Sequence, residues 1–433
     1  MPPVSADFAV ALDWLYSFSD MERGVGWNAR SNPRLEWNLR RTRVLLDLAG
    51  APDRTMICVL VAGTKGKGST ATMLARILSG SGIPTGLYTK PHLQSYRERI
   101  RVDGVAIEEA AFAQAADLVR PLVRELGRRL PSSGAPTTFE LTTVLALSHF
   151  AARGCRVAVV EVGLGGRLDA TNAVDPHVSV ITPISHDHTR LLGSRLSQIA
   201  LEKAGVLRPG RVAILAPQAA SVRATLLRHC AALAAEAREV RPPSSRTLPR
   251  DALALGGDHQ RVNAAVALAA AGALAEHGVA VRPDAIAALR DLRIPGRFEI
   301  VPGEPVTILD GAHNDGSAIA LARALHSAFP RRRVRLVIGV MEDKDARAVI
   351  TPLLERASAV FATRPPGPRG LDARALARLV RGVDVTAIDE PADAVAAARS
   401  SATRGEVVCV TGSLALVGRA RDVLGLPIAE RLW

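Results

Sequence analysis

A glycine-rich turn near residue 65 constrains this chain more than any other feature of its sequence. The apolar, β-type run Met56 to Ala62 leads into the segment GTKGKGST at 63–70, and a helix-like run from Thr70 to Leu78 follows. Glycines let backbone N–H groups approach phosphate oxygens, the helix N-terminus adds its positive dipole, and lysine adds a point charge. This order of strand, turn and helix predicts a nucleotide-binding α/β fold.

The turn matches the strict phosphate-loop pattern imperfectly. In that pattern the lysine directly precedes Ser or Thr, whereas here Gly68 separates Lys67 from Ser69. A glycine turn can also be purely structural, but the flanking strand and helix favour phosphate binding. We therefore expect a phosphate cradle at this turn, with Lys67 as its cation.

Size and charge narrow the class of protein. A chain of 433 residues with 48% hydrophobic residues favours a folded protein of two or three domains. The net charge of +13 fits a solvated basic surface, an acidic substrate or nucleic acid. The densest basic run, RRRVR at 331–335, has no interleaved aromatic residue, so we expect no nucleic-acid partner.

The cysteines and the termini bear on location. Cys58, Cys155, Cys230 and Cys409 lie far apart without a C-x-x-C pair, and we interpret them as buried, reduced side chains. The N-terminus carries no secretory signal pattern, and the longest uncharged apolar run, Ala264 to Ala275, is too short to cross a bilayer. The sequence predicts a cytoplasmic protein without a membrane partner.

β-like and helix-like runs alternate along the chain, which favours parallel sheets in an α/β fold. A break at Ile294-Pro295-Gly296-Arg297 predicts a domain boundary between residues 1–295 and 296–433, and 238–250 is expected to be an excursion or a small antiparallel element. We expect strands at 57–62, 84–89, 157–162, 178–184, 212–215, 306–309, 334–340, 359–362 and 407–410. We expect helices at 69–79, 108–126, 141–152, 196–204, 219–237, 262–276, 316–329, 347–356, 373–380 and 391–400.

Polar side chains follow several of these strands, where α/β folds form ligand sites. Glu161 ends an apolar run, and a carboxylate there suits Mg²⁺ bound together with a nucleotide. His186 and His188 follow another strand, but zinc would need a third or fourth ligand, and none is evident. Taken singly, each of these residues also has a purely structural interpretation. Glu161 could be a hydrated residue at a strand end, His188 a turn histidine, and Lys203 a solvated lysine on a helix.

Taken together, these segments resemble one family, the dihydrofolate synthase/folylpolyglutamate synthase family of the Mur ligase superfamily. The resemblance extends from about Leu12 to Gly425. It rests on VAGTKGKGST at 61, LYTKPHL at 87, RERIRVDG at 97, EVGLGGRLDATN at 161, DHT at 187, EKAG at 202, PGR at 295, LDGAHN at 309, GVMEDKD at 339, TRPP at 363 and VTGSL at 410. It implies a P-loop-containing, Mur-ligase-type N-terminal domain and a smaller Rossmann-like C-terminal α/β domain.

The resemblance implies an activity. The family joins L-glutamate to the carboxylate of dihydropteroate, or to the γ-carboxylate of a folate's glutamate tail. ATP first phosphorylates the acceptor carboxylate, and the glutamate amine then attacks the acyl phosphate. The family resemblance thus implies a monomeric, ATP-dependent amide ligase that uses one or two Mg²⁺ ions. Such an enzyme accelerates the reaction by positioning the substrates and neutralising their charge.

The resemblance also implies roles for individual residues. Implied ATP contacts are Gly63, Thr64, Lys65, Gly66, Lys67, Gly68, Ser69, Asn263, Arg297 and Asp310. Implied catalytic residues are Lys67, Glu161, His188 and Lys203, and implied metal ligands are Ser69, Glu161, His188 and Lys203 after carbamylation by CO₂. Carbamylation needs a neutral amine, so we expect Lys203 to be partly desolvated. Implied pterin-side contacts are Thr138, Phe139, Glu140, Leu168, Asp169 and Ala170, and implied glutamate contacts are His313 and Ser413.

The chain departs from the family pattern at four places. Lys90 stands where a Mg²⁺-binding Ser is usual, and an ammonium group has no lone pair for a metal. We expect Lys90 to contact a phosphate or an acidic substrate directly, while water completes the metal shell. Lys65 replaces a common Asn, Asp315 replaces a common Pro, and LEWNLRR at 35–41 differs from the usual folate-side segment.

Several alternatives stay open at this point. The enzyme could be a monofunctional folylpolyglutamate synthase or a related ligase acting on another carboxylate. The basic charge also fits a nucleotide-binding regulator on nucleic acid, which would show steep salt dependence but would leave Glu161, His188 and Lys203 idle. A zinc hydrolase at His186 and His188 is a further alternative.

Overall fold

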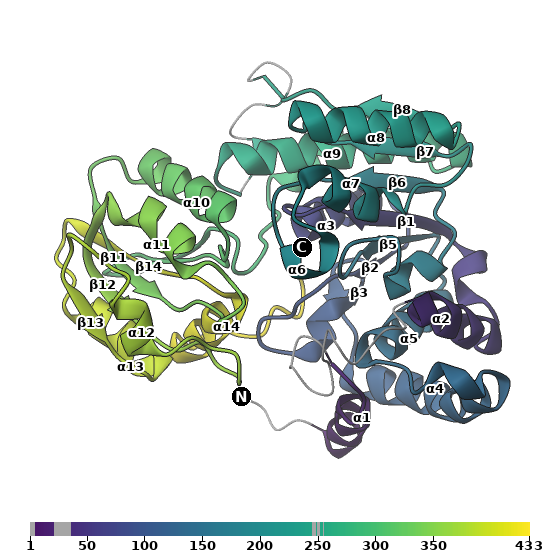
Figure 1. Cartoon of the computed structure of the whole chain (residues 1–433), viewed down its shortest axis with the longest axis horizontal. Helices are drawn as coiled ribbons and strands as arrows, with labels where there is room; N and C mark the ends of the chain where they lie inside the picture. Colours follow the sequence, from purple (N-terminus) through teal and green to yellow (C-terminus); the bar gives the residue numbers. More distant parts are fainter. Residues whose placement is uncertain (1–4, 21–35, 245–247, 249–251, 254) are drawn as a thin grey trace.

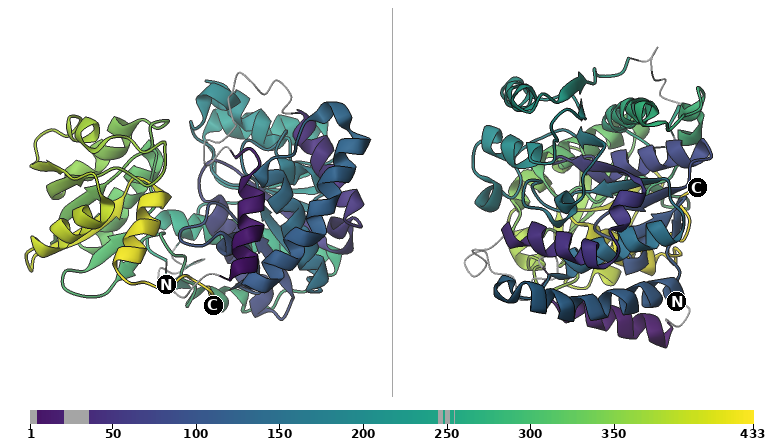
Figure 2. Two further views of the ribbon diagram at one scale, coloured as in Figure 1. Left: turned by 90° about the horizontal axis from the view of Figure 1, so that it is seen from below. Right: turned by 90° about the vertical axis from the view of Figure 1, so that its right-hand side faces the viewer.

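The computed structural model describes residues 5–20, 36–244, 248, 252–253 and 255–433. Its ribbon forms two bodies, a larger one built on an eight-stranded sheet and a smaller one built on a six-stranded sheet (Figure 1). We name them the first lobe and the second lobe. The left view of Figure 2 shows the two lobes side by side.

The first lobe is organised around the sheet order β4-β3-β2-β5-β1-β6-β7-β8. The central strands run parallel, whereas β3 pairs antiparallel with both β2 and β4. The sheet is therefore mixed, with the parallel central strands that the sequence predicts and an antiparallel edge. Its strands are β1 (Ile57–Ala62), β2 (Thr85–Tyr88), β3 (Ile100–Val102), β4 (Val105–Ala106), β5 (Val157–Glu161), β6 (Val178–Ile181), β7 (Val212–Leu215) and β8 (Glu236–Glu239).

The second lobe has the sheet order β13-β12-β11-β14-β10-β9, in which only the edge pair β9 and β10 is antiparallel. Its strands are β9 (Glu299–Val301), β10 (Thr307–Leu309), β11 (Arg333–Ile338), β12 (Ala357–Ala362), β13 (Val385–Ala387) and β14 (Glu406–Thr411). Helices α10, α11 and α12 pack in the cluster on one face, and α13 and α14 pack on the other. Their bounds are α10 (Asp315–Ala328), α11 (Ala346–Leu354), α12 (Ala373–Ala377), α13 (Pro391–Ser400) and α14 (Leu414–Val423).

Helices also cover both faces of the first sheet. On one face lie α3 (Lys67–Gly80) and α9 (Asp258–Leu274). The cluster on the other face includes α1 (Ala6–Tyr16), α2 (Glu36–Leu48), α4 (Glu109–Arg129), α5 (Thr138–Ala152), α7 (Leu196–Ala204) and α8 (Ala220–Ala232), and the short α6 (Thr189–Leu192) precedes α7. Because the central strands are buried on both faces, they appear in the sequence as continuous apolar runs.

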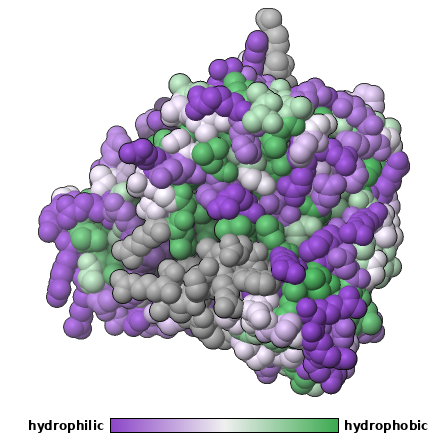
Figure 3. Space-filling model, turned by 45° about the vertical axis from the view of Figure 1, so that its right-hand side comes forward, coloured by the Kyte–Doolittle hydropathy of each residue, from purple (hydrophilic) through white to green (hydrophobic). Residues whose placement is uncertain are grey.

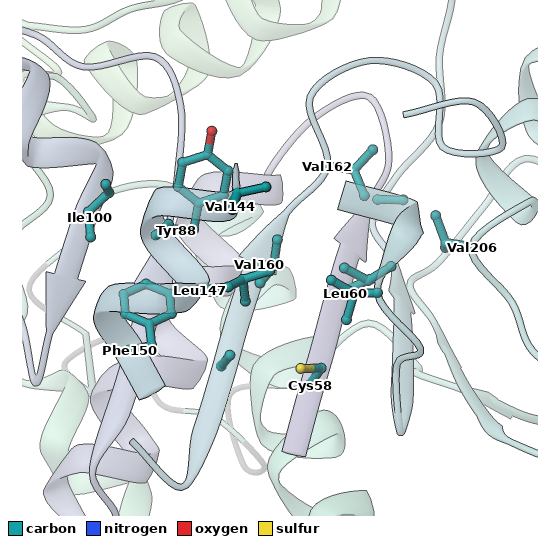
Figure 4. Close-up of a cluster of buried hydrophobic side chains, with 14 of the residues drawn as sticks. Cys58, Leu60, Tyr88, Ile100, Val144, Leu147, Phe150, Val160, Val162 and Val206 are labelled. Atoms are coloured by element: carbon teal, nitrogen blue, oxygen red, sulfur yellow. The ribbon is translucent and has the colours of Figure 1, made fainter. Parts of the chain in front are cut away.

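The two cores divide β1 between them. Its even-numbered residues Cys58 and Leu60 point into one cluster, and Val59 and Val61 point into the other. Figure 4 shows part of the first cluster, in which Val160 of β5 lies beside Leu147 of α5 and Leu60 lies on the neighbouring strand β1. This packing fixes β1 and β5 in the sheet and so fixes the turns that follow their carboxyl ends.

One predicted helix was wrong at its C-terminal end. The helix expected at 219–237 ends at Ala232, and residues 236–239 form β8, which pairs parallel with β7. The excursion expected at 238–250 therefore begins inside this parallel strand rather than in an antiparallel element. Residues 245–247 and 249–250 of that excursion lie outside the described residues.

The polypeptide chain itself links the lobes at both ends of the second lobe. The chain passes from α9 to β9 through residues 275–298, which contain the boundary proposed at residue 296. The last residues then return to the first lobe, where Arg431 bridges Val105 and the backbone N–H of Leu432 donates to the Gly104 carbonyl at 3.1 Å. The second lobe is thus held to the first at both of its ends.

The surface is largely hydrophilic on the face shown in Figure 3, and the cysteines are unpaired. On the face in Figure 3, hydrophilic residues alternate with small apolar areas. No helix in the described part of the chain is long and apolar enough to cross a membrane. All four cysteines are buried and unbridged, as their spacing predicts.

Candidate active site

A cavity of about 530 Å³ lies between the lobes, at the carboxyl ends of strands from both sheets. The first lobe contributes the turns after β1, β5 and β6, and the second lobe contributes the turn after β10. Such switch points are the usual ligand sites of α/β sheets. Its lining includes the predicted residues Gly63, Thr64, Lys65, Gly66, Lys67, Gly68, Ser69, Lys90, Glu161, His188, Lys203, Asn263, Arg297, Asp310 and His313.

Two glycines of the turn, Gly66 and Gly68, occupy positions where a side chain would meet a neighbouring group. Gly66 caps α3 in the left-handed conformation, with φ of +79°, and a Cβ there would lie 2.3 Å from Asn263 Oδ1. The helix begins at Lys67, and a Cβ on Gly68 would lie 3.2 Å from Glu161 Oε2. The additional glycine that separates Lys67 from Ser69 thus leaves room for the Glu161 carboxylate beside the helix N-terminus.

Two lysines converge on one backbone carbonyl of this turn. The ammonium of Lys203 donates to Gly63 O at 2.8 Å, and that of Lys67 donates to the same oxygen at 3.2 Å. Burial, followed by repulsion from Lys67, lowers the pKa of Lys203 to about 7. Burial also lowers the pKa of Lys67. Lys203 is therefore desolvated, as the sequence predicts, and a substantial fraction of it is neutral near neutral pH.

Glu161 is a buried carboxylate at the mouth of the phosphate cradle. Burial raises its pKa, and Lys67 opposes that shift. Its Oε2 accepts the backbone N–H of Lys90 at 3.0 Å. The Lys90 ammonium lies 5.3 Å from the centre of the Phe139 ring, so this side chain extends toward the neighbouring cavity described below.

His188 lies in the turn after β6, which also contacts the second lobe through Asp187 and Lys344. It adopts a left-handed conformation with φ of 48°, and burial, followed by Lys344, lowers its pKa to about 4. Its imidazole is therefore neutral at neutral pH and has a nitrogen lone pair for a metal. Burial raises the pKa of the adjacent Asp187, but His188 and Lys344 outweigh burial and hold it at about 2.

The connection between the lobes adds Arg297, and the turn after β10 adds Asp310 and His313. Both carboxylate oxygens of Asp310 accept backbone N–H groups, from Ala312 at 2.9 Å and Phe298 at 2.8 Å. The His313 ring contacts the Gly311 carbonyl through Nδ1 at 2.8 Å. Ser413, the other predicted glutamate contact, is not part of the cavity lining; its hydroxyl accepts the Leu416 N–H and caps α14.

A second cavity of about 250 Å³ adjoins the first, and Lys90, Gly163, Leu164 and Gly165 line both. Its lining contains every residue predicted for the pterin side, namely Thr138, Phe139, Glu140, Leu168, Asp169 and Ala170. Glu140 is fully buried and bound by Arg41 at 2.6 Å. Arg41 belongs to the segment 35–41 that differs from the family pattern, and sequence reasoning gave it no role.

The donor set suits a magnesium ion bound with phosphate better than a zinc ion. No group of three or more His, Cys, Asp or Glu side chains able to hold a metal occurs in the described residues. The zinc alternative at His186 and His188 therefore gains no support there. Mg²⁺ typically takes one or two protein ligands plus phosphate oxygens and water, which Ser69, Glu161 and His188 beside the cradle can supply.

Comparison with known proteins decides the family. The Mur ligase middle domain matches residues 61–209, and the glutamate ligase domain of Mur ligases matches residues 296–414. The dihydrofolate synthase/folylpolyglutamate synthase of Mycobacterium tuberculosis is 33% identical over 445 residues, which cover 90% of this chain and 91% of that protein. The chain belongs to the dihydrofolate synthase/folylpolyglutamate synthase family.

Solved structures of this family confirm the expected Mur-ligase-type α/β fold. Folylpolyglutamate synthase of Mycobacterium tuberculosis complexed with ADP matches with a TM-score of 0.85 and 31% identity, covering 98% of this chain and 99% of that chain. The bifunctional enzyme of Yersinia pestis complexed with AMPPNP and a manganese ion matches with a TM-score of 0.81 and 30% identity, covering 98% of this chain and 100% of that one.

The chain spans about half the length of another relative. A probable bifunctional folylpolyglutamate synthase/dihydropteroate synthase of Halobacterium salinarum is 36% identical over 386 residues, which cover 84% of this chain but 46% of that protein. The similarity to that protein therefore concerns only the region that the two chains share.

Proposed function

We propose that this protein is an ATP-dependent ligase that joins L-glutamate to a folate-type carboxylate. The acceptor is dihydropteroate, the γ-carboxylate of a folate's glutamate tail, or both. The observation that supports this most is the junction of two cavities, one carrying the phosphate cradle with Glu161, His188 and Lys203, the other carrying the pterin-side residues. Lys90 stands where the two meet.

The residues fit a two-step transfer. The backbone N–H groups of the turn and Lys67 hold the triphosphate, while the acceptor carboxylate enters from the second cavity. A carboxylate oxygen bonds to the γ-phosphorus and ADP leaves. The neutral amine of glutamate then bonds to the acyl carbon, phosphate leaves, and the amine loses a proton. Lys67 and Lys90 neutralise negative charge along this path.

The metal and the modified lysine complete the proposal. Ser69, Glu161 and His188 would hold Mg²⁺, which neutralises phosphate charge when bound. The neutral amine of Lys203 would add CO₂ and release a proton, and the resulting carbamate would offer anionic oxygens to a second ion. His313 and the Ser413 region would bind glutamate from the second lobe. We further propose that the enzyme works as a monomer in the cytoplasm.

An assay with two acceptors tests the function. ATP, Mg²⁺ and L-glutamate are supplied with dihydropteroate or with a reduced folate, and products are read by mass spectrometry alongside ADP release. Product from both acceptors indicates a bifunctional enzyme, and product from folate alone indicates a tail-extending synthase. ADP release without either product points to another carboxylate, and no turnover with any acceptor contradicts the proposal.

The Lys203 role has its own test. Lys203→Ala should lose most turnover, because a methyl group can form no carbamate, and added bicarbonate should raise the rate of the unmodified enzyme only. Equal activity of Lys203→Ala and the unmodified enzyme would exclude the carbamate. The nucleic-acid alternative predicts salt-sensitive retention on DNA, which the ligase proposal does not.

A further inference from the structure

Lysine is confined to one place in this molecule. Only five of the 55 Lys+Arg residues are lysines, at positions 65, 67, 90, 203 and 344. The first four line the cavity between the lobes, and Lys344 pairs with Asp187, which lines the same cavity. The other 50 of the 55 Lys+Arg residues are arginines. The rare lysines thus mark the active-site cleft.

Lysine and arginine differ in ways that matter in such a cleft. The guanidinium group is a broad plane that stays protonated, whereas the ammonium group is a compact point charge with three donors. A chain that uses arginine wherever a positive charge suffices keeps lysine where arginine cannot serve. Lys65, Lys67, Lys90 and Lys203 already have proposed roles, but Lys344 has none.

Lys344 links the two lobes through one carboxylate oxygen. Its ammonium lies 3.0 Å from Asp187 Oδ1, and the side chains are only 12% and 14% exposed. The same Oδ1 accepts the backbone N–H of His188 at 3.0 Å. Lys344 belongs to the turn after β11 in the second lobe, whereas Asp187 and His188 follow β6 in the first. A charge from one lobe therefore contacts the group that supports His188 in the other.

The backbone at His188 needs such support. Its φ of 48° and ψ of 39° place a residue with a Cβ in the left-handed region, a conformation that non-glycine residues seldom adopt. The ammonium of Lys344 also lies 3.6 Å from Asp343, so it is held between two carboxylates. A guanidinium is larger and planar, so we expect Lys344→Arg to disturb at least one of these two contacts.

We propose that Lys344 is a positioning residue that couples docking of the second lobe to the geometry of His188. Lys344 is not among the residues that line either cavity; it acts through Asp187 on the residue that the proposed function assigns to Mg²⁺. The inference rests on that function for the identity of the ion. When the second lobe docks, Lys344 fixes Asp187, and Asp187 fixes the turn that aims the imidazole into the cleft.

Nucleotide binding measured with and without metal tests the coupling. AMPPNP binding is followed by calorimetry across a Mn²⁺ series for Lys344→Met, Lys344→Arg, Asp187→Asn and the double variant Lys344→Met/Asp187→Asn. Partners that orient metal ligands typically contribute about 10–100-fold to metal affinity. Lys344→Met should raise the Mn²⁺ concentration for half-maximal binding by that factor and leave metal-free binding unchanged.

Three comparisons make the test decisive. Lys344→Arg should not restore the Mn²⁺ dependence, and the double variant should be no worse than either single variant, because both changes break one link. Arg369→Met removes a positive charge that lies 3.8 Å from Asp343 in the same region, and it should bind as the unmodified protein does.

Three results would overturn the proposal. Unchanged Mn²⁺ dependence in Lys344→Met would remove the coupling, and a rise in the glutamate KM alone would make Lys344 a substrate contact instead. An unchanged Mn²⁺ dependence of AMPPNP binding in Lys344→Arg would show that an arginine can replace this lysine. Because the readout is nucleotide binding without an acceptor, it stands even if the ligase assay finds neither folate product.

Discussion

Gly66 shows how one residue can carry both conformation and space. Its φ of +79° disfavours any side chain, and a Cβ would collide with Asn263 Oδ1 at 2.3 Å. Gly66→Ala should therefore weaken ADP binding and also destabilise the fold by about 1–3 kcal/mol. Gly82 has the same φ of +79° with nothing within 4 Å of a Cβ, so Gly82→Ala is the matched control.

Calorimetry with ADP and thermal unfolding separate the two effects. Gly82→Ala should share the backbone cost of Gly66→Ala and should bind ADP normally. Equal ADP affinity in both variants would show that the contact with Asn263 has no part in shaping the phosphate cradle.

Lys203 makes a pH-dependent contribution to stability. Its pKa falls from 10.5 to about 7 on folding, so the unfolded chain binds the extra proton between these values. The penalty for burying the charge is complete below pH 7 and declines as pH rises toward 10.5, with an upper bound of about 5 kcal/mol at 1.36 kcal/mol per unit. Lys203→Met should therefore be more stable than the unmodified protein at pH 6.

That advantage should shrink steadily between pH 7 and pH 9 in chemical denaturation without CO₂. A constant difference over this range would contradict the lowered pKa. Added bicarbonate offers an internal check, because carbamylation can alter the unmodified protein but not Lys203→Met.

Individual site residues were predictable where a local pattern reports a local geometry. The turn at 63–69 and Glu161 lie at strand ends, so their place follows from strand order alone. Asn263 and Lys344 reach the cleft through tertiary packing, and no local pattern places them there. The sequence singles out Lys344 only through the small number of lysines in the whole chain, and no pattern of neighbouring residues does so.

At the scale of elements, α2 and α5 are joined by one buried ion pair. Arg41 binds both carboxylate oxygens of Glu140 in the wall of the second cavity. Removing one partner leaves a buried charge unpaired, which typically costs about 3–5 kcal/mol. Arg41→Met should lose about that much free energy of unfolding, measured with urea.

The double variant Arg41→Met/Glu140→Leu is the informative control, because replacing both charges by apolar groups is often close to neutral. It should recover most of the stability that Arg41→Met loses. If the double variant is less stable than Arg41→Met, the pair stabilises the fold by more than charge compensation.

Elements were predictable where apolar periodicity is strong and were missed where main-chain pairing alone decides. Strands β1 and β7 occur at the predicted residues because they are buried in the sheet. Strand β8 has the sequence EARE, which has high helix propensity and no apolar alternation, so its first two residues fall in the predicted helix and its last two in the predicted excursion. Its pairing with β7 at the sheet edge overrides that preference. Helices α1 and α2 lie before the first recognisable segment and were not predicted.

For the whole molecule, the carboxyl edges of two sheets face one cavity, so catalysis depends on how the lobes are held. The polypeptide link near residue 296 alone would leave the second lobe free to move, as lobes with small contacts usually are. Lys344 and Asp187 connect the lobes at the cavity, and the C-terminal residues connect them at the far edge of the first sheet.

The C-terminal residues act as a second tether. Arg97 binds the Glu430 carboxylate, the Ala106 N–H donates to Glu430 O at 2.8 Å, and the Trp433 ring packs against Gly104. Deleting residues 429–433 should remove this tether and expose the edge of β4. We expect scanning calorimetry to show one unfolding transition for the full chain and two for the shortened chain.

Arg431→Ala is the matched control, because its exposed side chain is lost while the backbone bridge to Val105 is kept, and it should unfold like the full chain. A single transition at an unchanged temperature in the shortened chain would mean that the remaining contacts couple the lobes, among them the Lys344–Asp187 pair and the hydrogen bonds of Gln94 with α14. In that case Lys344→Met together with Gln94→Ala in the shortened chain should separate the two transitions, because the two changes remove the charged contact at Asp187 and the side-chain hydrogen bonds between Gln94 and α14.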